Sequence, residues 1–339
     1  MLATQESKRK EAMLHPHVLA DVVRPQLDAL TAFMEQQVIT FEDEVQDLVR
    51  YCLKNQGKRI RPMLLFFSGW TEPAQDFTDL VRAAAVVELV HLATLVHDDI
   101  LDDATLRHNL DTVSAKYGCS VAVLLGDALF SQALNLATDF PTVDVCRAVS
   151  FSTRRVCAGE IKQTFERGNS DFPLDAYFNV IDFKTAELFR VSCYLGAKMA
   201  GYEDAFVTAC AAFGRHLGMA YQIFDDIADF LGEEAKIGKT LGTDLESGKY
   251  TLPMLLLLQT LDTADRDALI ARMQAKEVTV NEICGLLKQH KIHDAVIEHF
   301  FAELKAAEQA LEGFSKQAPV HHLLQLSRYV THLVSKLSS

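Results

Sequence analysis

The sequence has little of what marks a secreted disulfide scaffold or a nucleic-acid-binding protein. Its seven cysteines are scattered and odd in number, and they form no C-x-x-C pair, so a disulfide framework and a cysteine metal knuckle are excluded. Positive charge is also scarce, because 33 lysines and arginines accompany 46 acidic residues and give a formal net charge of −13. We therefore expect no nucleic-acid partner, and an anionic ligand would need locally gathered cations.

Targeting and membrane segments are also lacking. The first 15 residues, MLATQESKRKEAMLH, carry charges but no apolar core of signal-peptide length follows them, and no later run reaches ~18 uninterrupted apolar residues. We expect a cytoplasmic protein that is not a membrane protein, with a flexible N-terminus over residues 1–15. No Pro/Ser-rich linker divides the chain, which favours one domain over residues 1–339.

Strand patterns are nearly absent, whereas helical patterns occur almost everywhere. Apolar residues recur at helical spacing in runs such as FTDLVRAAAVVELVHLATLVHDD and YEDAFVTACAAFGRHLGMAYQIFDDIADFL. Breakers such as GWTEPAQD and RGNSDFPLD fall between these runs. The sequence therefore predicts an all-α protein, a single-domain bundle of roughly a dozen helices.

One short pattern, DDxxD, occurs twice, each time near the C-terminal end of an apolar run. The two copies are Asp98, Asp99 and Asp102, and Asp225, Asp226 and Asp229. On a helix the first and last aspartate of a copy lie one turn apart, so each copy forms an acidic edge. Two carboxylates about 5 Å apart repel by ~3 kcal/mol at an effective dielectric of about 20, so such edges need cations. A single copy would favour a solvated helix end, but two copies favour Mg²⁺ ions that bridge carboxylates to a diphosphate.

Basic residues stand beside glycines and predicted helix starts, where an anion is favoured. Singly, each would be an ordinary surface or snorkelling side chain, but together with two acidic edges they predict a diphosphate site. These residues are Lys58, Arg59 and Arg61 in NQGKRIRPML, Lys184 in DFKTAELF, and Lys239 and Lys249 in GKTLGTDLESGKYTLP.

From about Gly57 to Pro253 the chain resembles the trans-isoprenyl diphosphate synthases, the polyprenyl synthetase family. The resemblance is carried, in the family's order, by GKRIRP, ELVHLATLVHDDILDDATLR, GEIKQ, KTAELF, YQIFDDIAD and GKTLGTDLESGKYTLP. It implies the isoprenoid synthase fold around a deep central cavity, usually a homodimer. It also implies the head-to-tail condensation of an allylic diphosphate with isopentenyl diphosphate, with about three Mg²⁺ ions per active site.

The resemblance also implies roles for individual residues. All six DDxxD aspartates would bind Mg²⁺, some of them through water. The allylic diphosphate would be held by Arg107, Lys184 and Lys239, with Gln222 lining the same site and Thr185 and Gln163 helping to stabilise the carbocation. Isopentenyl diphosphate would be held by Lys58, Arg61 and His91, and Lys249 would help to close the loop over the metals.

This chemistry explains why such residue types are needed. Magnesium and cationic side chains stabilise the charge that develops on the leaving diphosphate, so that the allylic C–O bond ionises. The homoallylic double bond then attacks the cation, and the released diphosphate can take the proton. An apolar cavity protects the cation from water, so no side-chain base is required.

Product length is predicted from the helix that ends in the first DDxxD. In the resembling family a bulky aromatic residue one turn or more before this motif stops growth early, whereas the residues here are Ala93, Thr94, Val90 and Val87. Each further turn adds about 5.4 Å of depth. We expect a product longer than farnesyl diphosphate, although Phe130 or a facing helix could close the pocket.

The chain departs from the resembling family directly after the first motif. Where the family has two arginines and a glycine, this sequence has Arg107, His108 and Asn109. The position of His108 would help to bind isopentenyl diphosphate, but histidine, with a reference pKa of ~6.5, matches arginine only when protonated. We expect weaker and more pH-dependent binding of this substrate, while Asn109 tolerates a glycine-like left-handed conformation.

Three other functions fit parts of the pattern. Another class I terpenoid enzyme, such as a cyclase, would use the same ionisation, but the second DDxxD and the pair Lys58 and Arg61 argue against it. A non-catalytic subunit of a heteromeric prenyl synthase would typically lose aspartates that are intact here. A helical scaffold with solvated acidic edges would not explain the ordered basic motifs.

Overall fold

The computed structural model describes residues 16–54, 57–73, 76–231, 244 and 247–335. The predicted flexible segment 1–15 and Lys239 lie outside the described residues. The all-α class is confirmed, because the described strands are limited to the short antiparallel pair β1 (Leu106–Arg107) and β2 (Leu110–Asp111).

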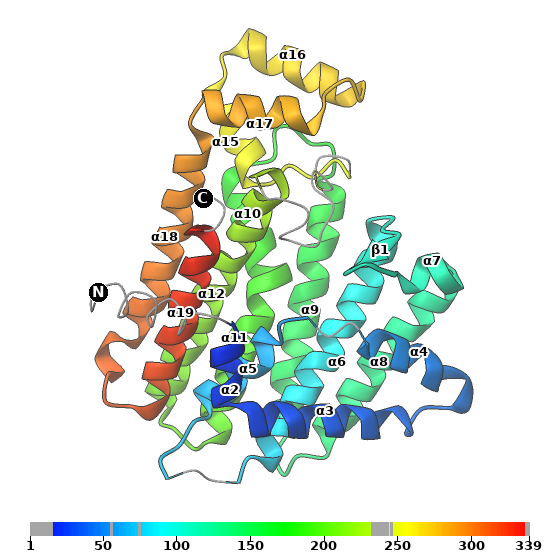
Figure 1. Ribbon diagram of the computed structural model, residues 1–339, viewed down its shortest axis with the longest axis vertical. Helices are drawn as coiled ribbons and strands as arrows, with labels where there is room; N and C mark the ends of the chain where they lie inside the picture. Colours follow the sequence, from blue (N-terminus) through cyan, green and yellow to red (C-terminus); the bar gives the residue numbers. More distant parts are fainter. Residues whose placement is uncertain (1–15, 55–56, 74–75, 232–243, 245–246, 336–339) are drawn as a thin grey trace, which may run out of the picture.

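Helices account for nearly all of the remaining described chain (Figure 1). In chain order they are α2 (Pro16–Val22), α3 (Arg24–Val38), α4 (Asp43–Leu53), α5 (Ile60–Ser68), α6 (Thr78–Leu101), α7 (Val113–Tyr117), α8 (Cys119–Thr138), α9 (Asp144–Phe165), α10 (Leu174–Ile181), the π-helix η1 (Asp182–Ala186), α11 (Glu187–Met199), α12 (Asp204–Leu231), α15 (Leu252–Thr260), α16 (Thr263–Gln274), α17 (Val280–Gln289), α18 (Ile292–Leu311), the 3₁₀-helix η2 (Glu312–Phe314) and α19 (Ala318–Ser335).

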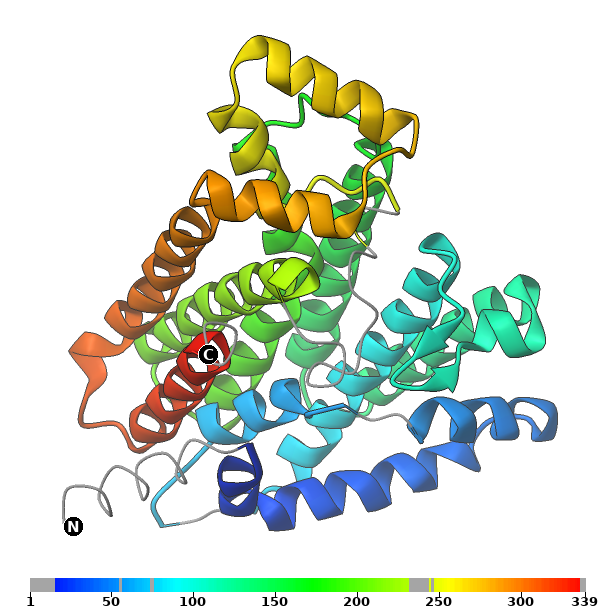
Figure 2. The same cartoon turned by 45° about the horizontal axis from the view of Figure 1, so that its top comes forward.

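The centre of the bundle is built by helices that are apolar on most sides. In α6 the residues from Ala83 to Val87 are all at most 2% exposed, because neighbouring helices cover this helix on several faces. It packs against α8, α5 and α3, while α12 packs against α11 and α18. Helix α3 lies across one end of the bundle, and α16 and α17 lie at the opposite end (Figures 1 and 2).

Two helices, α6 and α8, are long and apolar enough to cross a membrane by length and composition. A core helix of a soluble protein passes the same test, and 61% of the apolar window of α6 is buried inside the structure. For α8 the buried share is only 33%. Its outer side carries Val123, Leu124 and Leu134, which are 44%, 69% and 41% exposed. Helix α8 therefore presents an apolar face that the described chain leaves uncovered.

Candidate active site

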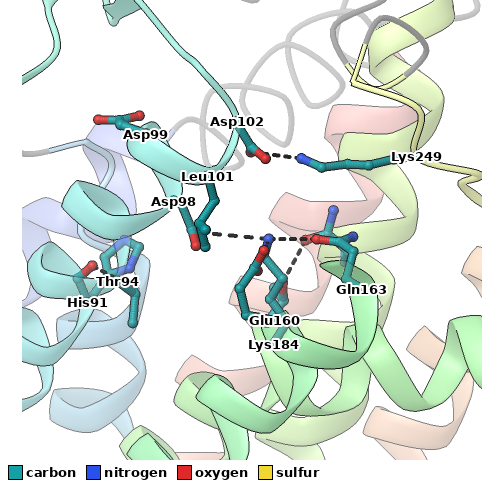
Figure 3. Close-up of polar contacts among 12 residues, drawn as sticks. His91, Thr94, Asp98, Asp99, Leu101, Asp102, Glu160, Gln163, Lys184 and Lys249 are labelled. Carbon is teal, nitrogen blue, oxygen red and sulfur yellow. Dashed lines mark hydrogen bonds and ion pairs between the residues drawn. The ribbon is translucent and has the colours of Figure 1, made fainter. Parts of the chain in front are cut away.

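The first acidic cluster lies where α6 ends. Asp98 and Asp99 occupy the last turn of the helix, and Asp102 caps it with its backbone N–H on the carbonyl of Asp98 at 2.9 Å. Figure 3 shows Asp98 pointing towards Lys184, whereas Asp99 points away from it. Only part of this DDxxD copy therefore faces the interior of the site, as the one-turn spacing of Asp98 and Asp102 predicts.

Cations from distant parts of the chain surround this cluster. Asp102 accepts hydrogen bonds from Lys249 Nζ at 2.7 Å and Arg167 Nη2 at 2.6 Å. Asp99 pairs with Arg107, whose Nε lies 2.8 Å from its Oδ1. Asp102 is thus paired with cations from distant parts of the chain, and Asp99 with the nearby Arg107.

The cations give the carboxylates of this cluster different pKa values. Burial raises the pKa of Asp98 to about 6, because the nearby Lys184 only partly offsets the loss of hydration. Burial also opposes ionisation of Asp102, but Lys249 and Arg167 outweigh it and lower its pKa. Asp102 is therefore held as a carboxylate, whereas Asp98 ionises at a higher pH than an ordinary aspartate.

The second cluster lies in the last turns of α12, where Asp226 accepts hydrogen bonds from two neutral side chains. Asp226 is 2% exposed and accepts hydrogen bonds from Tyr177 on α10 at 2.5 Å and from Gln222 at 2.7 Å. Burial, with Asp244 nearby, raises the pKa of Asp226 to about 8. Asp229, also 2% exposed, accepts the backbone N–H of Asp244 at 3.2 Å. Hydroxyl, amide and backbone groups therefore position this cluster.

One chain of contacts connects the two clusters. Lys249, which contacts Asp102, donates its backbone N–H to the carbonyl of Asp244 at 2.9 Å, and Asp244 in turn contacts Asp229. The C-terminal ends of α6 and α12 accordingly lie at the same end of the bundle (Figure 1). The predicted pairing of two acidic edges around one space agrees with this arrangement, and the predicted role of Lys239 lies outside the described residues.

Lys184 and Thr185 enter the site from a π-helical turn, where the sequence predicted regular helix. Lys184 Nζ contacts Glu160, donates to Gln163 Oε1 at 2.8 Å and lies 4.0 Å from Asp98 Oδ2 (Figure 3). Burial lowers the pKa of Lys184, but Asp98 and Glu160 outweigh burial and raise it. A charged lysine is therefore held directly beside the first cluster.

The polar residues predicted to act together on the allylic side are also brought together. Thr185 donates its hydroxyl to Gln222 Oε1 at 2.7 Å, and Gln222 also donates to Asp226. The π-turn thus places Lys184 against α9 and the neighbouring Thr185 against α12. Side chains from three separate sequence motifs meet at this point.

The residues predicted for isopentenyl diphosphate form a second group. Arg61 Nη1 lies 2.9 Å from His91 Nε2, and the Arg61 guanidinium lies 5.0 Å from the centre of the Phe189 ring. Burial and the adjacent Arg61 lower the pKa of His91 well below its usual value, so His91 is neutral and accepts from Arg61. The buried Nε of Arg61 has no hydrogen-bond partner among the described residues.

His108 and Asn109 form the two-residue turn between β1 and β2. Their φ angles are 49° and 64°, which is the left-handed pair that a tight hairpin requires, and histidine and asparagine tolerate it better than most residues. The expected left-handed Asn109 is confirmed. Burial and the cations Arg107 and Lys58 lower the pKa of His108, so the free protein carries a neutral imidazole at this position at neutral pH.

The residues predicted to set product length lie in the packed centre of α6. Ala93 is fully buried, Val90 and Val87 are each 2% exposed, and Thr94 donates its hydroxyl to the carbonyl of His91 at 2.7 Å. Phe130 on α8 lies beside His97, with ring centres 5.8 Å apart. Small or aliphatic side chains thus occupy these four positions within about three turns before Asp98, and their effect on product length stays a prediction.

The donor set fits Mg²⁺. Carboxylate oxygens are the ligands this ion prefers, and the raised pKa values of Asp98 and Asp226 show two buried acids that lack a full complement of positive charge. Within the described ranges no three acidic, imidazole or thiol groups are already gathered around one point.

Four contact residues were missed by the sequence analysis. Glu160 could have been found, since it follows Gly159 in GEIKQ and precedes Gln163 by about one turn. Arg167 falls among breaker residues, and Tyr177 reaches Asp226 across 49 positions of sequence, so no local pattern indicates either of them. Asp244 reaches Asp229 across 15 positions of sequence, so no local pattern indicates it.

Comparison with known proteins supports one family. A family model described as polyprenyl synthetase matches residues 42–289. Heptaprenyl diphosphate synthase component 2 of Geobacillus stearothermophilus is 32% identical over 84% of this chain and 91% of its own length. An all-trans-nonaprenyl-diphosphate synthase of Rhodobacter capsulatus is 29% identical over 88% of this chain and 92% of its own.

Solved structures agree with these sequence relatives. A decaprenyl diphosphate synthase from Rhodobacter capsulatus superposes with a TM-score of 0.86 and 26% identity, covering 94% of this chain and 99% of that one. A polyprenyl synthase from Caulobacter crescentus, complexed with calcium and isoprenyl diphosphate, superposes with a TM-score of 0.86 and 25% identity. The match covers 93% of this chain and 97% of that one. The bundle described above is therefore the fold of these enzymes.

Proposed function

Because the chain belongs to the polyprenyl synthetase family, we propose that it condenses an allylic diphosphate with isopentenyl diphosphate, head to tail and with Mg²⁺, to give a trans-polyprenyl diphosphate. The observation that carries this proposal is the contact chain from Asp102 through Lys249 and Asp244 to Asp229. It joins two acidic clusters that are far apart in sequence at one end of the bundle. A diphosphate bridged by metal ions is the ligand that such an arrangement suits.

Each group of residues has a distinct task in this proposal. Bound Mg²⁺ supplies Lewis-acid stabilisation of the leaving diphosphate. Lys184 and Arg107 bind and orient that diphosphate, and Lys249 stands at the same edge. Thr185 and Gln163 would stabilise the carbon that becomes cationic, and Gln222, which contacts Thr185, lines the same site. These groups act in the transition state more than in the ground state, so their loss lowers kcat.

The second substrate is assigned to the group around Arg61. A diphosphate oxygen there would satisfy the buried Arg61 Nε, and the resemblance assigns Lys58 and His108, which lie near each other, to the same substrate. The neutral His108 supplies less charge than an arginine would. We therefore retain the hypothesis that isopentenyl diphosphate binds more weakly and with more pH dependence than in members with arginine at this position.

We assign the product to a chain longer than farnesyl diphosphate. The support is the absence of aromatic residues among Ala93, Thr94, Val90 and Val87, and the names of the relatives, which act as heptaprenyl and nonaprenyl synthases. Product sizing by chromatography with allylic primers of several lengths tests this assignment. A product that stops at farnesyl diphosphate with every primer would contradict it.

We propose that the enzyme is a homodimer that pairs through α8 and α9. Besides the apolar face of α8, the neighbouring α9 exposes Phe151, Ile161 and Phe165, which are 44%, 55% and 82% exposed and follow one side of the helix. Apolar side chains gathered in this way favour association. A monomer at micromolar concentration in size-exclusion chromatography with light scattering would contradict this part.

A second candidate is one component of a heteromeric synthase. It is favoured by the similarity to heptaprenyl diphosphate synthase component 2. Incubation of the purified chain alone with Mg²⁺, isopentenyl diphosphate and allylic primers separates the candidates. Elongation by the chain alone supports the main proposal. Elongation only after a second protein is added supports the heteromer, and no elongation in either case refutes both.

A further inference from the structure

The π-helix η1 is the element that brings Lys184 and Thr185 into the site. These two adjacent residues reach opposite walls, because Lys184 contacts Glu160 and Gln163 on α9 while Thr185 contacts Gln222 on α12. A π-helical turn inserts one extra residue into an α-helix, and such turns recur at functional sites. Removing it would rotate one flank by about 100°, so either Lys184 or Thr185 would leave its partner. The site therefore depends on this local distortion being maintained.

Buried charges hold the first residue of the turn. Asp182 is 7% exposed, and each of its carboxylate oxygens accepts a hydrogen bond from an arginine. Oδ1 accepts from Arg215 Nε on α12 at 2.6 Å, and Oδ2 accepts from Arg155 Nη2 on α9 at 3.2 Å. The Arg155 guanidinium also lies 3.8 Å from the centre of the Phe183 ring. Asp182 is thus attached to the same two helices, α9 and α12, that receive the side chains of Lys184 and Thr185.

A second buried carboxylate follows the turn. Glu187 is fully buried and accepts from Ser152 at 2.7 Å, from Arg155 Nε at 2.9 Å and from Arg190 Nη2 at 2.6 Å. Arg190 belongs to α11 itself, one turn after Glu187. It contacts Glu187 and Ser152, but no contact with Asp182 is recorded for it in the described structure. Arg155 alone of the three arginines binds both carboxylates.

Close backbone packing holds the turn from its two sides. A Cβ added to Gly159 on α9 would lie 2.7 Å from the Lys184 backbone N, and one added to Gly218 on α12 would lie 2.6 Å from the Ala186 Cα. Both distances are shorter than side chains tolerate, so glycine is required for α9 and α12 to approach the turn. The turn is therefore fixed by backbone contact as well as by charge.

We propose that Asp182, with Arg155 and Arg215, is a set of positioning residues that maintains the π-turn and thereby aims Lys184 and Thr185 at the allylic substrate. A buried ion network is a poor source of net stability, because desolvation offsets much of its attraction, so its value lies in the geometry it specifies. The inference rests on the proposed prenyl transfer. It adds to that proposal a group that does not itself contact either substrate.

The test compares two substitutions in the same network. Arg215→Met removes a cation that contacts Asp182, whereas Arg190→Met removes a cation that contacts Glu187 outside the turn. The Arg215 side chain is 41% exposed, so its methionine variant is expected to fold. Melting temperatures of the full-length proteins verify folding. Kinetics are then measured for the allylic substrate and for isopentenyl diphosphate.

We expect Arg215→Met to lower kcat about tenfold, because Lys184 and Thr185 lose their shared orientation. The KM for isopentenyl diphosphate stays within about twofold, since the group around Arg61 is untouched. Arg190→Met keeps both parameters within about twofold. Arg215→Lys, which restores a donor to Asp182, recovers most of the lost kcat.

Equal kcat values for Arg215→Met and Arg190→Met would overturn the inference, as would failure of the lysine variant to recover activity. Should Arg215→Met not fold, Arg215→Lys and Arg215→Gln are compared instead, and equal kcat values for these two would overturn it. If the wild-type protein elongates no primer, the proposed function fails by itself. If the wild type elongates a primer and Arg215→Met has the same kcat as Arg190→Met, only the positioning role fails.

Discussion

The two DDxxD clusters have the same sequence pattern but different surroundings. In the first, Lys249 and Arg167 hold Asp102 as a carboxylate and lower its pKa, against the effect of burial. In the second, Tyr177 and Gln222 donate to Asp226, and burial raises its pKa to about 8. Equal motifs therefore do not imply equal charge, because partners from elsewhere in the fold set the protonation state.

The difference indicates a division of labour. At the first cluster, protein cations already balance part of the charge, so a metal ion competes with Lys249 and Arg167 for Asp102. At the second cluster, a metal ion competes with a proton on Asp226. Mg²⁺ binding there is expected to release protons near neutral pH, whereas binding at Asp102 is expected to displace side chains. The predictions below test this comparison from the largest effect to the smallest.

The largest effect is expected from removing the first aspartate of either cluster. Asp98→Ala and Asp225→Ala should each lower kcat by about a thousandfold, because either change would remove an oxygen ligand from a Mg²⁺ ion that binds the diphosphate. The measurement is steady-state elongation at saturating Mg²⁺. The control is Asp103→Asn, an exposed neighbour outside the motif with φ of 49°, which asparagine tolerates. A wild-type kcat in either alanine variant would show that the corresponding cluster takes no part in the reaction.

A second change should act on the first cluster alone. A Cβ at Gly126 on α8 would lie 2.1 Å from His97 Nε2, and His97 directly precedes Asp98. Gly126→Ala should lower the free energy of unfolding by about 2 kcal/mol through overpacking, and should lower kcat by displacing Asp98. Denaturant unfolding and kinetics measure the two effects.

The matched control for this change is Gly285→Ala in α17. An added Cβ there meets nothing within 4 Å. Alanine has the higher helix propensity, so stability should rise by up to about 1 kcal/mol with unchanged kcat. Equal stability losses in both alanine variants would show that contact with His97 is not the cause.

A smaller effect is expected at the hairpin beside the first cluster. The lowered pKa of His108 leaves it neutral at pH 7, and it gains a proton only as the pH falls through that pKa. The KM for isopentenyl diphosphate should therefore rise as the pH increases through this lowered pKa, below about pH 6.5, and then stay level up to about pH 9, where His108→Arg should lower it about tenfold. Identical pH profiles of the two proteins would contradict the role of His108.

The smallest effect concerns the stability of the metal-free protein. The pKa of Asp226 is raised by folding, so its contribution is fully present below about pH 4 and is lost as the pH rises through about 8. With a chelator present, the fall in Tm between about pH 5 and about pH 8 should be roughly 5 °C smaller for Asp226→Asn than for the wild type. Any loss of Tm that the substitution causes equally at both pH values cancels, because the change in Tm between the two pH values is compared.

Asp103→Asn serves again as the control, and its Tm difference should equal that of the wild type. A wild-type pH dependence that persists in Asp226→Asn would assign the titration to another group. The comparison of the two clusters would then lose its electrostatic basis, while their proposed role in binding Mg²⁺ would be unaffected.

Much of the fold and part of the site could be predicted from the sequence. Apolar residues at helical spacing indicate the helices, and the spacing of Asp98 and Asp102 indicates a common face, because both depend on local periodicity. Asn109 indicates the left-handed turn because asparagine tolerates that backbone conformation, which is also a local property. The π-turn at Lys184 could not be predicted in this way, because its extra residue is stabilised by Arg155 and Arg215 on other helices.

The sequence by itself determined the chemical inventory: two sets of carboxylates, a group of lysines and arginines, and helices long enough to bring them to one end of a bundle. Only the tertiary structure decided which aspartates are charged, that Arg167 and Tyr177 belong to the site, and that Lys184 leaves the α-helical register. The physical reason is that pKa values and close packing depend on groups brought together across long stretches of sequence. Helix formation and residue identity are local.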